Sequence, residues 1–177
     1  HYFYPTDRTG ELVDSLDEQN RLLKSVFDNS HGSEANKLVT IESISDSVST
    51  LRRYVGLQKI QPTIDMIRGY LYNFPEEKVV VFAIHKDVIE GINEALREDY
   101  NSVSVYGGTP PHKRVKKMKK FIMNPTCRVF IGNIRAAGTA INLTVARKVI
   151  FAEADWVPGN NAQAVMRCHR IGQENKV

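Results

Sequence analysis

The chain has 177 residues, of which 42% are hydrophobic and 25% are charged, a composition that supports one good-sized domain with a real core. Its longest apolar runs are far shorter than the roughly 20 residues that cross a bilayer, so we expect no membrane-spanning helix. The net charge of +4 is uneven, because residues 1–56 carry six Lys or Arg against nine Asp or Glu while residues 57–177 carry 18 against 11, and the basic part fits a polyanionic partner.

The first 56 residues predict a helical extension. Apolar residues recur at helical spacing from about residue 10 to 27 and again from 41 to 55, with a loop of polar residues between them. Neither helix carries a residue type that demands chemistry. We therefore expect residues 1–56 to form a helical bracket that leads from a preceding lobe, with Gly56 as the boundary.

Strands and helices alternate through residues 57–177. A helix is predicted over about 57–72, and the β-branched run 78–84 has the pattern of a strand buried on both faces. The elements that follow are a helix over 87–96, a strand over 102–106, a helix over 112–122, and strands over 128–131 and 148–152. This alternation predicts an α/β fold, a doubly wound parallel sheet with helices on both faces.

A glycine turn and a basic helix follow the second predicted strand. Ligands of open α/β sheets sit beyond the carboxyl ends of the strands, and Gly107, Gly108 and Thr109 stand there. The helix after them carries six basic residues and no acid: Lys113, Arg114, Lys116, Lys117, Lys119 and Lys120. We expect contacts to a nucleic-acid backbone; the alternative is an ordinary solvated helix. Its apolar stripe of Val115, Met118 and Phe121 is expected to be core.

Two further loops follow strands. Residues 132–144 combine small residues with amides and hydroxyls, which suit a phosphate or a ribose, although a small-residue helix packed on the sheet would look the same. In the loop 153–160, Glu153 and Asp155 are expected to cap or to pair with arginines rather than to catalyse. Trp156 is expected to be a packed wedge, and His85 and His169 structural residues, because neither histidine has a visible metal-binding or nucleophilic partner.

The stretch 163–173 carries Arg167 and Arg170, three residues apart. On a helix both guanidinium groups leave the same face, and together they could grip an anion with several oxygens. The alternative is a solvated helix end. The chain has no Gly-x-x-x-x-Gly-Lys-Ser/Thr loop and no acidic metal-binding strand. We therefore expect another domain to supply any nucleotide, and no metal site in this chain.

Cysteine usage and chain ends add two expectations. Cys127 and Cys168 lack metal-ligand spacing, which indicates a reducing intracellular compartment. The chain begins without Met and stops where a further strand is expected, so we expect it to be a piece of a longer protein.

In residues 78–177 the chain resembles the second RecA-like lobe of Swi/Snf-like superfamily-two DNA translocases. The resemblance rests on Val79–Asp87, on Tyr106–Thr109 with Arg114 and Phe121, on 136–144, and on Asp155-Trp156-x-Pro158 with Gln163–Gln173. Residues 51–67 also resemble the segment before this lobe. The sequences Ala-Ala-Gly-Thr and Phe-Ala-Glu resemble most the annealing-helicase, fork-remodelling branch of this family.

The resemblance implies a location in the nucleus in a eukaryote and otherwise in the cytoplasm, and it implies roles for individual residues. Arg170 would be the arginine finger and Arg167 its partner on ATP bound, with Mg²⁺, to the N-terminal RecA-like lobe of the same protein. Gln163, Gly138 and Asn142 would belong to the nucleotide side. Double-stranded or forked DNA would be held by Gly107, Gly108, Thr109, Lys113, Arg114, Lys117, Asn133 and Arg135. The fragment alone would hydrolyse no ATP.

Several positions depart from the family pattern. Ala140 replaces a frequent glycine, Asn133 a usual Ser or Thr, Arg147 a frequent Asp or Ser, and Val165-Met166 an acidic position. Three alternatives stay open: a catalytically inactive RecA-like module that binds nucleic acid or protein, a nucleosome-remodelling ATPase lobe, and a free-standing nucleotide-binding enzyme, which the missing phosphate loop disfavours.

Overall fold

The computed structural model describes residues 21, 48–135 and 143–168. The chain divides into two compact units, His1–Gln58 and Lys59–Val177. In the first unit residues 48–58 are helical, and most of the two helices predicted before them lies outside the described residues. The helix runs through Gly56, so the expectation that this glycine ends it is wrong; one glycine costs a helix only about 1 kcal/mol. The break falls at Lys59, which is a turn.

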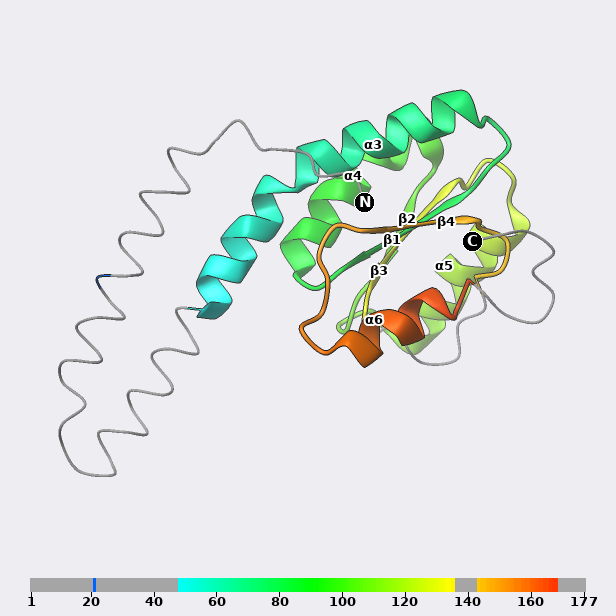
Figure 1. Ribbon diagram of the computed structural model, residues 1–177. Coiled ribbons are helices and arrows are strands. Elements are labelled where there is room, and N and C mark those ends of the chain that lie inside the picture. Colours follow the sequence, from blue (N-terminus) through cyan, green and yellow to red (C-terminus); the bar gives the residue numbers. More distant parts are fainter. Residues whose placement is uncertain (1–20, 22–47, 136–142, 169–177) are drawn as a thin grey trace. The chain divides into compact units, whose positions relative to one another are not determined.

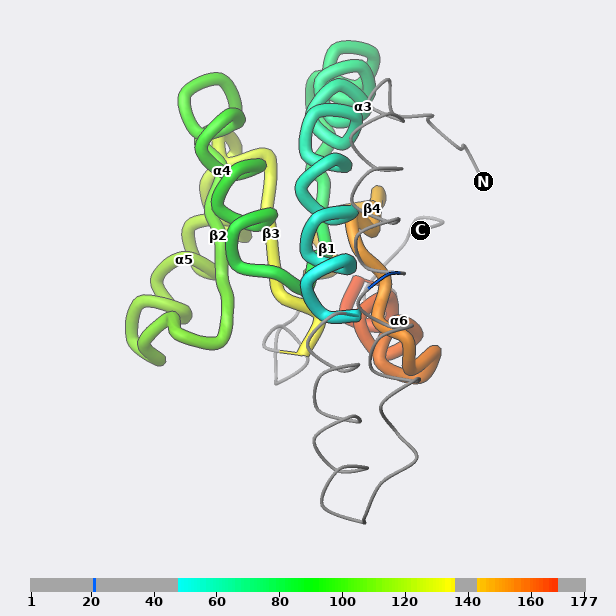
Figure 2. The backbone as a smooth tube through the Cα atoms, turned by 90° about the vertical axis from the view of Figure 1, so that its left-hand side faces the viewer, coloured from blue at the N-terminus to red at the C-terminus, as the bar shows by residue number. Residues whose placement is uncertain are grey.

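The second unit is built on four parallel strands: β1 (Val79–Ala83), β2 (Val103–Val105), β3 (Val129–Asn133) and β4 (Lys148–Phe151). Their order in the sheet is β2-β3-β1-β4, which Figure 2 shows from left to right. Val81 of β1 lies beside Ile131 on one side and Ile150 on the other. β1 is therefore central, which explains why all five of its residues are buried and why its sequence is continuously apolar.

Within the described residues, four helices cover the sheet: α3 (Ile60–Asn73), α4 (Lys86–Tyr100), α5 (Pro111–Met123) and α6 (Pro158–Val165). Figure 1 shows them on both sides of the strands. Val80 and Phe82 point into a core completed by Phe121 of α5 and Ala164 of α6. The alternate side chains of β1 are equally buried and lie on the other face, where α3 packs on α4 and α4 on the sheet. The predicted fold class, an α/β sheet with helices on both faces, is confirmed.

The C-terminal ends of α3, α4 and α5 are stabilised either by a basic side chain that binds the last carbonyls or by a residue in the left-handed conformation. Nη2 of Arg128 donates to the carbonyl oxygens of Leu71 and Phe74 at the end of α3. The ammonium of Lys78 likewise donates to the carbonyls of Phe121 and Asn124 at the end of α5. Asn101 terminates α4 with φ 49°. Basic side chains and an asparagine in the left-handed region are favourable at helix C-termini.

Two predictions of core packing are wrong. Val115, placed in the apolar stripe of α5, is 51% exposed, whereas Phe121 of the same stripe is fully buried. Trp156, expected as a packed wedge, is 68% exposed. In both cases the apolar residue type was taken for burial, but a helix on the outer layer buries only one narrow face, and a single exposed apolar side chain is normal at a protein surface.

Candidate functional site

The loops that follow the strands meet at one edge of the sheet, because parallel strands end on the same side. Backbone hydrogen bonds fix them there. The amide of Ile134, just after β3, donates to the carbonyl of Ala83 at the end of β1 (3.1 Å), and the amide of Ala152 donates to the carbonyl of Phe82 (3.0 Å). The segments after all four strands therefore lie at one carboxyl edge.

The turn after β2 is stabilised by its own hydrogen bonds, and the backbone of its two glycines is exposed to solvent. The amide of Thr109 donates to the carbonyl of Tyr106 (2.9 Å), and Oγ1 of Thr109 accepts from the amide of Tyr106 (3.1 Å). Thr109 is buried, while Gly107 and Gly108 are exposed. A Cβ added at Gly107 would have nothing within 4 Å, and its φ is not in the left-handed region. Packing does not require glycine here, whereas close approach of a ligand to the backbone would.

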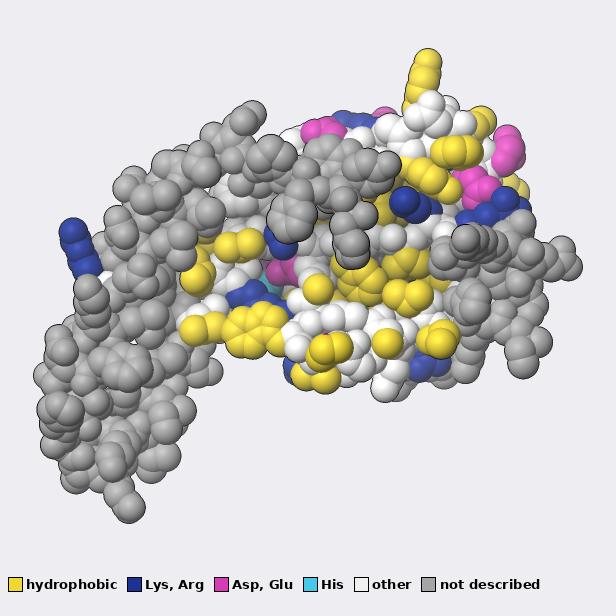
Figure 3. Space-filling model, viewed as in Figure 1, with side chains coloured by type: hydrophobic (Ala, Val, Ile, Leu, Met, Phe, Trp, Pro, Cys, Tyr) yellow, Lys and Arg dark blue, Asp and Glu magenta, His cyan; other side chains and the backbone are white. Residues whose placement is uncertain are grey.

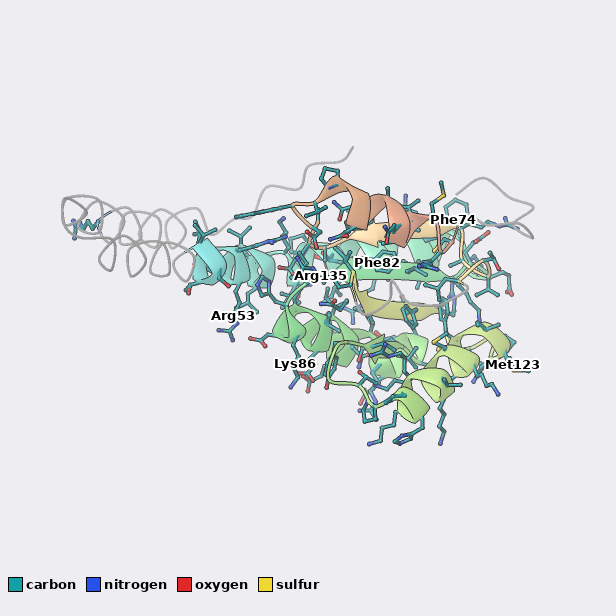
Figure 4. The ribbon with its side chains drawn as sticks, turned by 90° about the horizontal axis from the view of Figure 1, so that it is seen from below. Arg53, Phe74, Phe82, Lys86, Met123 and Arg135 are labelled. Atoms are coloured by element: carbon teal, nitrogen blue, oxygen red, sulfur yellow. The ribbon has the colours of Figure 1, made fainter. Side chains whose placement is uncertain are left out.

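Lys86 is a candidate that sequence reasoning missed. It is the first residue of α4, directly after β1, and its side chain is exposed. Its Nζ lies 5.4 Å from the centre of the Tyr106 ring, and 3.7 Å from Oε1 of Glu90. Figure 4 shows it at the end of α4 that meets the carboxyl edge, opposite Met123 at the far end of α5. Its position in the first turn after the central strand was the signal that could have identified it.

Glu153 joins the end of β4 to the beginning of α4. One carboxylate oxygen accepts from the amides of Ile84 (2.8 Å) and His85 (2.9 Å), and the other lies 2.6 Å from Nδ1 of His85. Glu153 is 4% exposed. These amides belong to the two residues that precede α4, so the carboxylate fixes the turn from β1 into the helix. The structural rather than catalytic role expected for Glu153 agrees with these contacts, although its partners are two backbone amides and His85 and not an arginine. The contacts also agree with the structural role expected for His85.

Asn133 and Arg135 carry scaffold contacts of their own. Nδ2 of Asn133 donates to the carbonyl of Ile84 (2.6 Å), and its Oδ1 accepts from the amide of Arg135 (3.0 Å). Nε of Arg135 lies 3.2 Å from Oδ2 of Asp155, while 75% of the arginine side chain is exposed. Both residues thus tie strand ends together, and their predicted contacts to DNA stay predictions. Figure 3 shows acidic, basic and histidine side chains meeting in a small polar patch beside hydrophobic ones.

Asp155 organises the start of α6. Its Oδ1 accepts from the amide of Val157 (3.0 Å), and its own amide and carbonyl are both bound by the side-chain amide of Asn161 (2.8 Å each). The Val157 amide, with help from Arg135, lowers the pKa of Asp155 to about 2. The residue is therefore an ionised cap and partner at neutral pH, as predicted, and is not poised to exchange a proton.

Gln163 and Arg167 lie together at the end of α6. With Ala162 and Met166 they line a pocket of about 290 Å³. The α-helix ends at Val165, so the expectation that Arg167 leaves a continuous helix is wrong: its amide donates to the carbonyl of Ala164 (3.2 Å) in a tighter turn. The carbonyl of Arg167 accepts from the amide of Leu143 (3.0 Å), which fixes this turn beside the end of the loop after β3.

Three predicted residues, Gly138, Asn142 and Arg170, lie outside the described part of the chain. The basic residues of α5 divide into two sets. Lys113 and Lys117 line a groove along β2, whereas Arg114 is half-buried and is not among the residues that line it. The predicted site residues are thus spread over the turn after β2, the groove beside it and the pocket at the end of α6.

The donor set suits phosphate oxygens rather than a metal ion. Within residues 48–135 and 143–168, no group of three or more His, Cys, Asp or Glu could hold a metal. The side-chain amide of Gln163 and the guanidinium of Arg167 in the α6 pocket can bind phosphate, as can the exposed backbone at Gly107 and Gly108. No helix in the described ranges is long and apolar enough to cross a membrane.

Comparisons with solved structures show the fold. The chain matches the Sulfolobus solfataricus SWI2/SNF2 ATPase core in complex with dsDNA with a TM-score of 0.68 and 23% identity, over 93% of this chain and 37% of that one. It matches the C-terminal part of the Fun30 ATPase domain with a TM-score of 0.62 and 22% identity, over 90% of this chain and 59% of that one.

Comparisons with curated proteins show the family. The chain is 33% identical over 144 residues to the Caenorhabditis elegans homolog of SWI/SNF-related matrix-associated actin-dependent regulator of chromatin subfamily A-like protein 1, over 80% of this chain and 21% of that protein. It is 29% identical over 174 residues to DNA annealing helicase and endonuclease ZRANB3 of Bos taurus, over 98% of this chain and 15% of that protein. The chain thus spans about a fifth or less of the length of these relatives.

A family profile covers most of the second unit. Residues 58–172 match the helicase conserved C-terminal domain, a range that includes the turn after β2, the loop after β3, and both Arg167 and Arg170. The chain therefore belongs to the helicase C-terminal domain family, as an SNF2-family member.

Proposed function

We propose that this chain is the C-terminal motor lobe of an ATP-dependent double-stranded DNA translocase. The observation that carries the proposal is the turn after β2, whose exposed glycine backbone at Gly107 and Gly108 is not required by packing. Lys86 stands beside it against Tyr106. Backbone amides with an adjacent cation form a phosphate site that is blind to base sequence, which a motor that moves along DNA needs.

The nucleotide side of the lobe lies at the end of α6. ATP supplies the phosphate chain whose cleavage powers translocation, and Gln163 and Arg167 are the described residues that would hold its phosphate oxygens. The guanidinium of Arg167 binds such oxygens with a fixed fork of donors, and the amide of Gln163 sets its approach. The role of Arg170 as the arginine finger belongs to the same proposal, as does the assignment of Gly138 and Asn142 to the nucleotide side. ATP and Mg²⁺ would be held mainly by the other lobe.

A backbone hydrogen bond and an ion pair connect elements on the proposed nucleotide side of the lobe with elements on its proposed DNA side. The bond from Leu143 to Arg167 connects the end of the loop after β3 to the nucleotide pocket. At the carboxyl edge, Arg135 of the same loop is paired with Asp155. A shift at Arg167 on lobe closure would therefore reach the segment that leads to the DNA side.

The finer proposal is that the parent protein remodels forks or anneals strands. Its support is that two of the relatives matched, in Bos taurus and Mus musculus, are named DNA annealing helicases, at 29% and 32% identity. ATP turnover of the full-length parent on forked DNA, linear duplex and nucleosomes tests this. We expect forks to stimulate turnover most. Greatest stimulation by nucleosomes would replace the fork proposal with a nucleosome-remodelling lobe.

A binding module is the second candidate. It would use the same exposed glycine turn and the same basic side chains to bind nucleic acid, without ATP hydrolysis. In the same turnover assay, intact DNA binding with no ATP hydrolysis on any substrate would establish the inactive module and end the motor proposal.

A further inference from the structure

A basic groove runs along the open edge of the sheet, at β2. It has a volume of about 560 Å³ and is bounded by α4 on one face of the sheet, by the edge strand, and by α5 on the other face. Five of the side chains that line it are cationic and none is acidic: Arg97, Lys113, Lys116, Lys117 and Lys120. The rest of the lining is polar or small: Asn93, Ser102, Val103 and Ser104.

The spacing on α5 concentrates this charge. Lys113, Lys116 or Lys117, and Lys120 follow one another at three or four residues, so they occupy one helix face. This face spans about 10 Å along the helix axis, at about 1.5 Å per residue. Lys119 of the same helix is exposed and does not line the groove. Basic residues surround the exposed side of α5, but only the face that lines the groove shares it with a cation of α4, Arg97.

The cations repel one another in the absence of a ligand. Lys117 is half-buried, and burial, followed by the charges of Lys113 and Arg97, lowers the pKa of its ammonium group. An anion with more than one charge would relieve the repulsion among these cations.

The occupant is not an added β-strand. β2 has only three residues, and Nζ of Lys117 donates to the carbonyl of Ser104 (2.8 Å), so this carbonyl already has a side-chain partner. The hydroxyl of Ser102 is likewise turned onto Asn93, to both its carbonyl and its side-chain oxygen (3.0 Å each). A lysine side chain that already binds a carbonyl of an edge strand disfavours pairing with another chain there. The groove therefore favours a compact anion over an acidic peptide that would extend the sheet.

We propose that the groove between α4 and α5 binds an anion that carries two or more phosphate groups, at a site separate from the nucleotide pocket at the end of α6. Two sources share this chemistry: a free polyphosphate, and successive phosphates of a nucleic-acid strand that passes the turn at Gly107. The second source rests on the proposed function, because α5 begins two residues after Thr109; the first source does not.

The test measures binding of inorganic tripolyphosphate to the 177-residue chain by calorimetry at about 0.15 M salt. The groove variant is Arg97→Gln with Lys116→Gln, which leaves the Lys117–Ser104 bond in place. The matched control is Arg68→Gln with Lys119→Gln, which removes the same charge from exposed positions that do not line the groove. We expect saturable binding that weakens at least tenfold in the groove variant and less than threefold in the control. Circular dichroism checks that all variants fold.

A competing single-stranded oligonucleotide identifies the source of the phosphates. If tripolyphosphate displaces the oligonucleotide from the groove, and the groove variant weakens both, the site takes strand phosphates. If the groove variant weakens only tripolyphosphate, it takes a free anion. Equal loss in groove and control variants, or no saturable tripolyphosphate binding, overturns the proposal. If Gly107→Ala loses duplex binding but still binds tripolyphosphate, the groove is a site distinct from the DNA contact at the turn. If Gly107→Ala does not weaken duplex binding, the proposed DNA contact at the turn is wrong, and the groove proposal is unaffected.

Discussion

Glu153 and His85 are 68 residues apart in the sequence, yet Oε1 of the glutamate lies 2.6 Å from Nδ1 of the histidine. The same carboxylate also accepts the amides of Ile84 and His85 at the start of α4. This pair fixes the end of β4 against the beginning of α4, and thereby the edge at which Lys86, Gly107 and Arg135 are presented.

Removal of this carboxylate should destabilise the fold. In Glu153→Ala, two amides and the imidazole lose a buried acceptor, and we expect the free energy of unfolding to fall by about 3 kcal/mol. Urea denaturation measures it. The control is Glu98→Gln on the exposed side of α4, with an expected change below about 0.5 kcal/mol. A Glu153→Ala loss no larger than the control would show that this carboxylate is not needed.

Asp155 should make part of the stability depend on acid. Because the amide of Val157 lowers its pKa from 3.8 to about 2, the ionised group stabilises the fold above pH 3.8, and this contribution is lost as the pH falls toward 2. Asp155→Asn should therefore be less stable than the wild type at pH 7, and the difference should shrink between pH 4 and 2. Urea denaturation at pH 7, 4, 3 and 2.5 measures the gap, and a constant gap contradicts the assignment.

Gly107→Ala should separate folding from DNA binding. The added methyl group meets no atom of the chain, so we expect the free energy of unfolding to stay within about 0.5 kcal/mol of the wild type, or to rise slightly. A phosphate held on the backbone would be pushed away, and we expect duplex affinity to fall about tenfold at fixed salt.

Gly69→Ala on α3 is the matched control, because a Cβ there also has nothing within 4 Å. Fluorescence anisotropy with a labelled duplex should show unchanged affinity for it. Equal affinity in both variants would falsify the assignment of the turn after β2 to a DNA phosphate.

The two cysteines should resist alkylation in the folded chain. Cys127 and Cys168 are fully buried, and burial raises the pKa of both thiols, that of Cys168 to about 12. At pH 8 only about one Cys168 thiol in ten thousand would be a thiolate, the reactive form. Mass spectrometry after iodoacetamide treatment should find both unmodified, and both labelled in 8 M urea. Fast labelling of the native chain would contradict their burial.

The sequence predicted the sheet because local patterns determine it. The β-branched run at β1 and the helical periodicity of α3, α4 and α5 were read correctly, to within a few residues at the ends. The bond between Glu153 and His85, and the joint lining of one groove by Arg97 and Lys116, depend on contacts between elements distant in sequence, which no local pattern encodes. The end of α6 at Val165 was missed because the residues after it, Met166 to Cys168, favour a helix locally but form a turn.

ATP turnover of the full-length parent protein, with and without DNA, tests the central claim most directly. Arg170→Ala and Arg167→Ala are compared with Arg68→Ala, because Arg68 pairs with Asp99 at the surface and neither residue lines the pocket. The account predicts DNA-stimulated turnover that falls about a thousandfold or more in Arg170→Ala, strongly in Arg167→Ala, and not in the control, because an arginine that stabilises the transferring phosphoryl group contributes several powers of ten in rate. Turnover in Arg170→Ala equal to that of the control would contradict it.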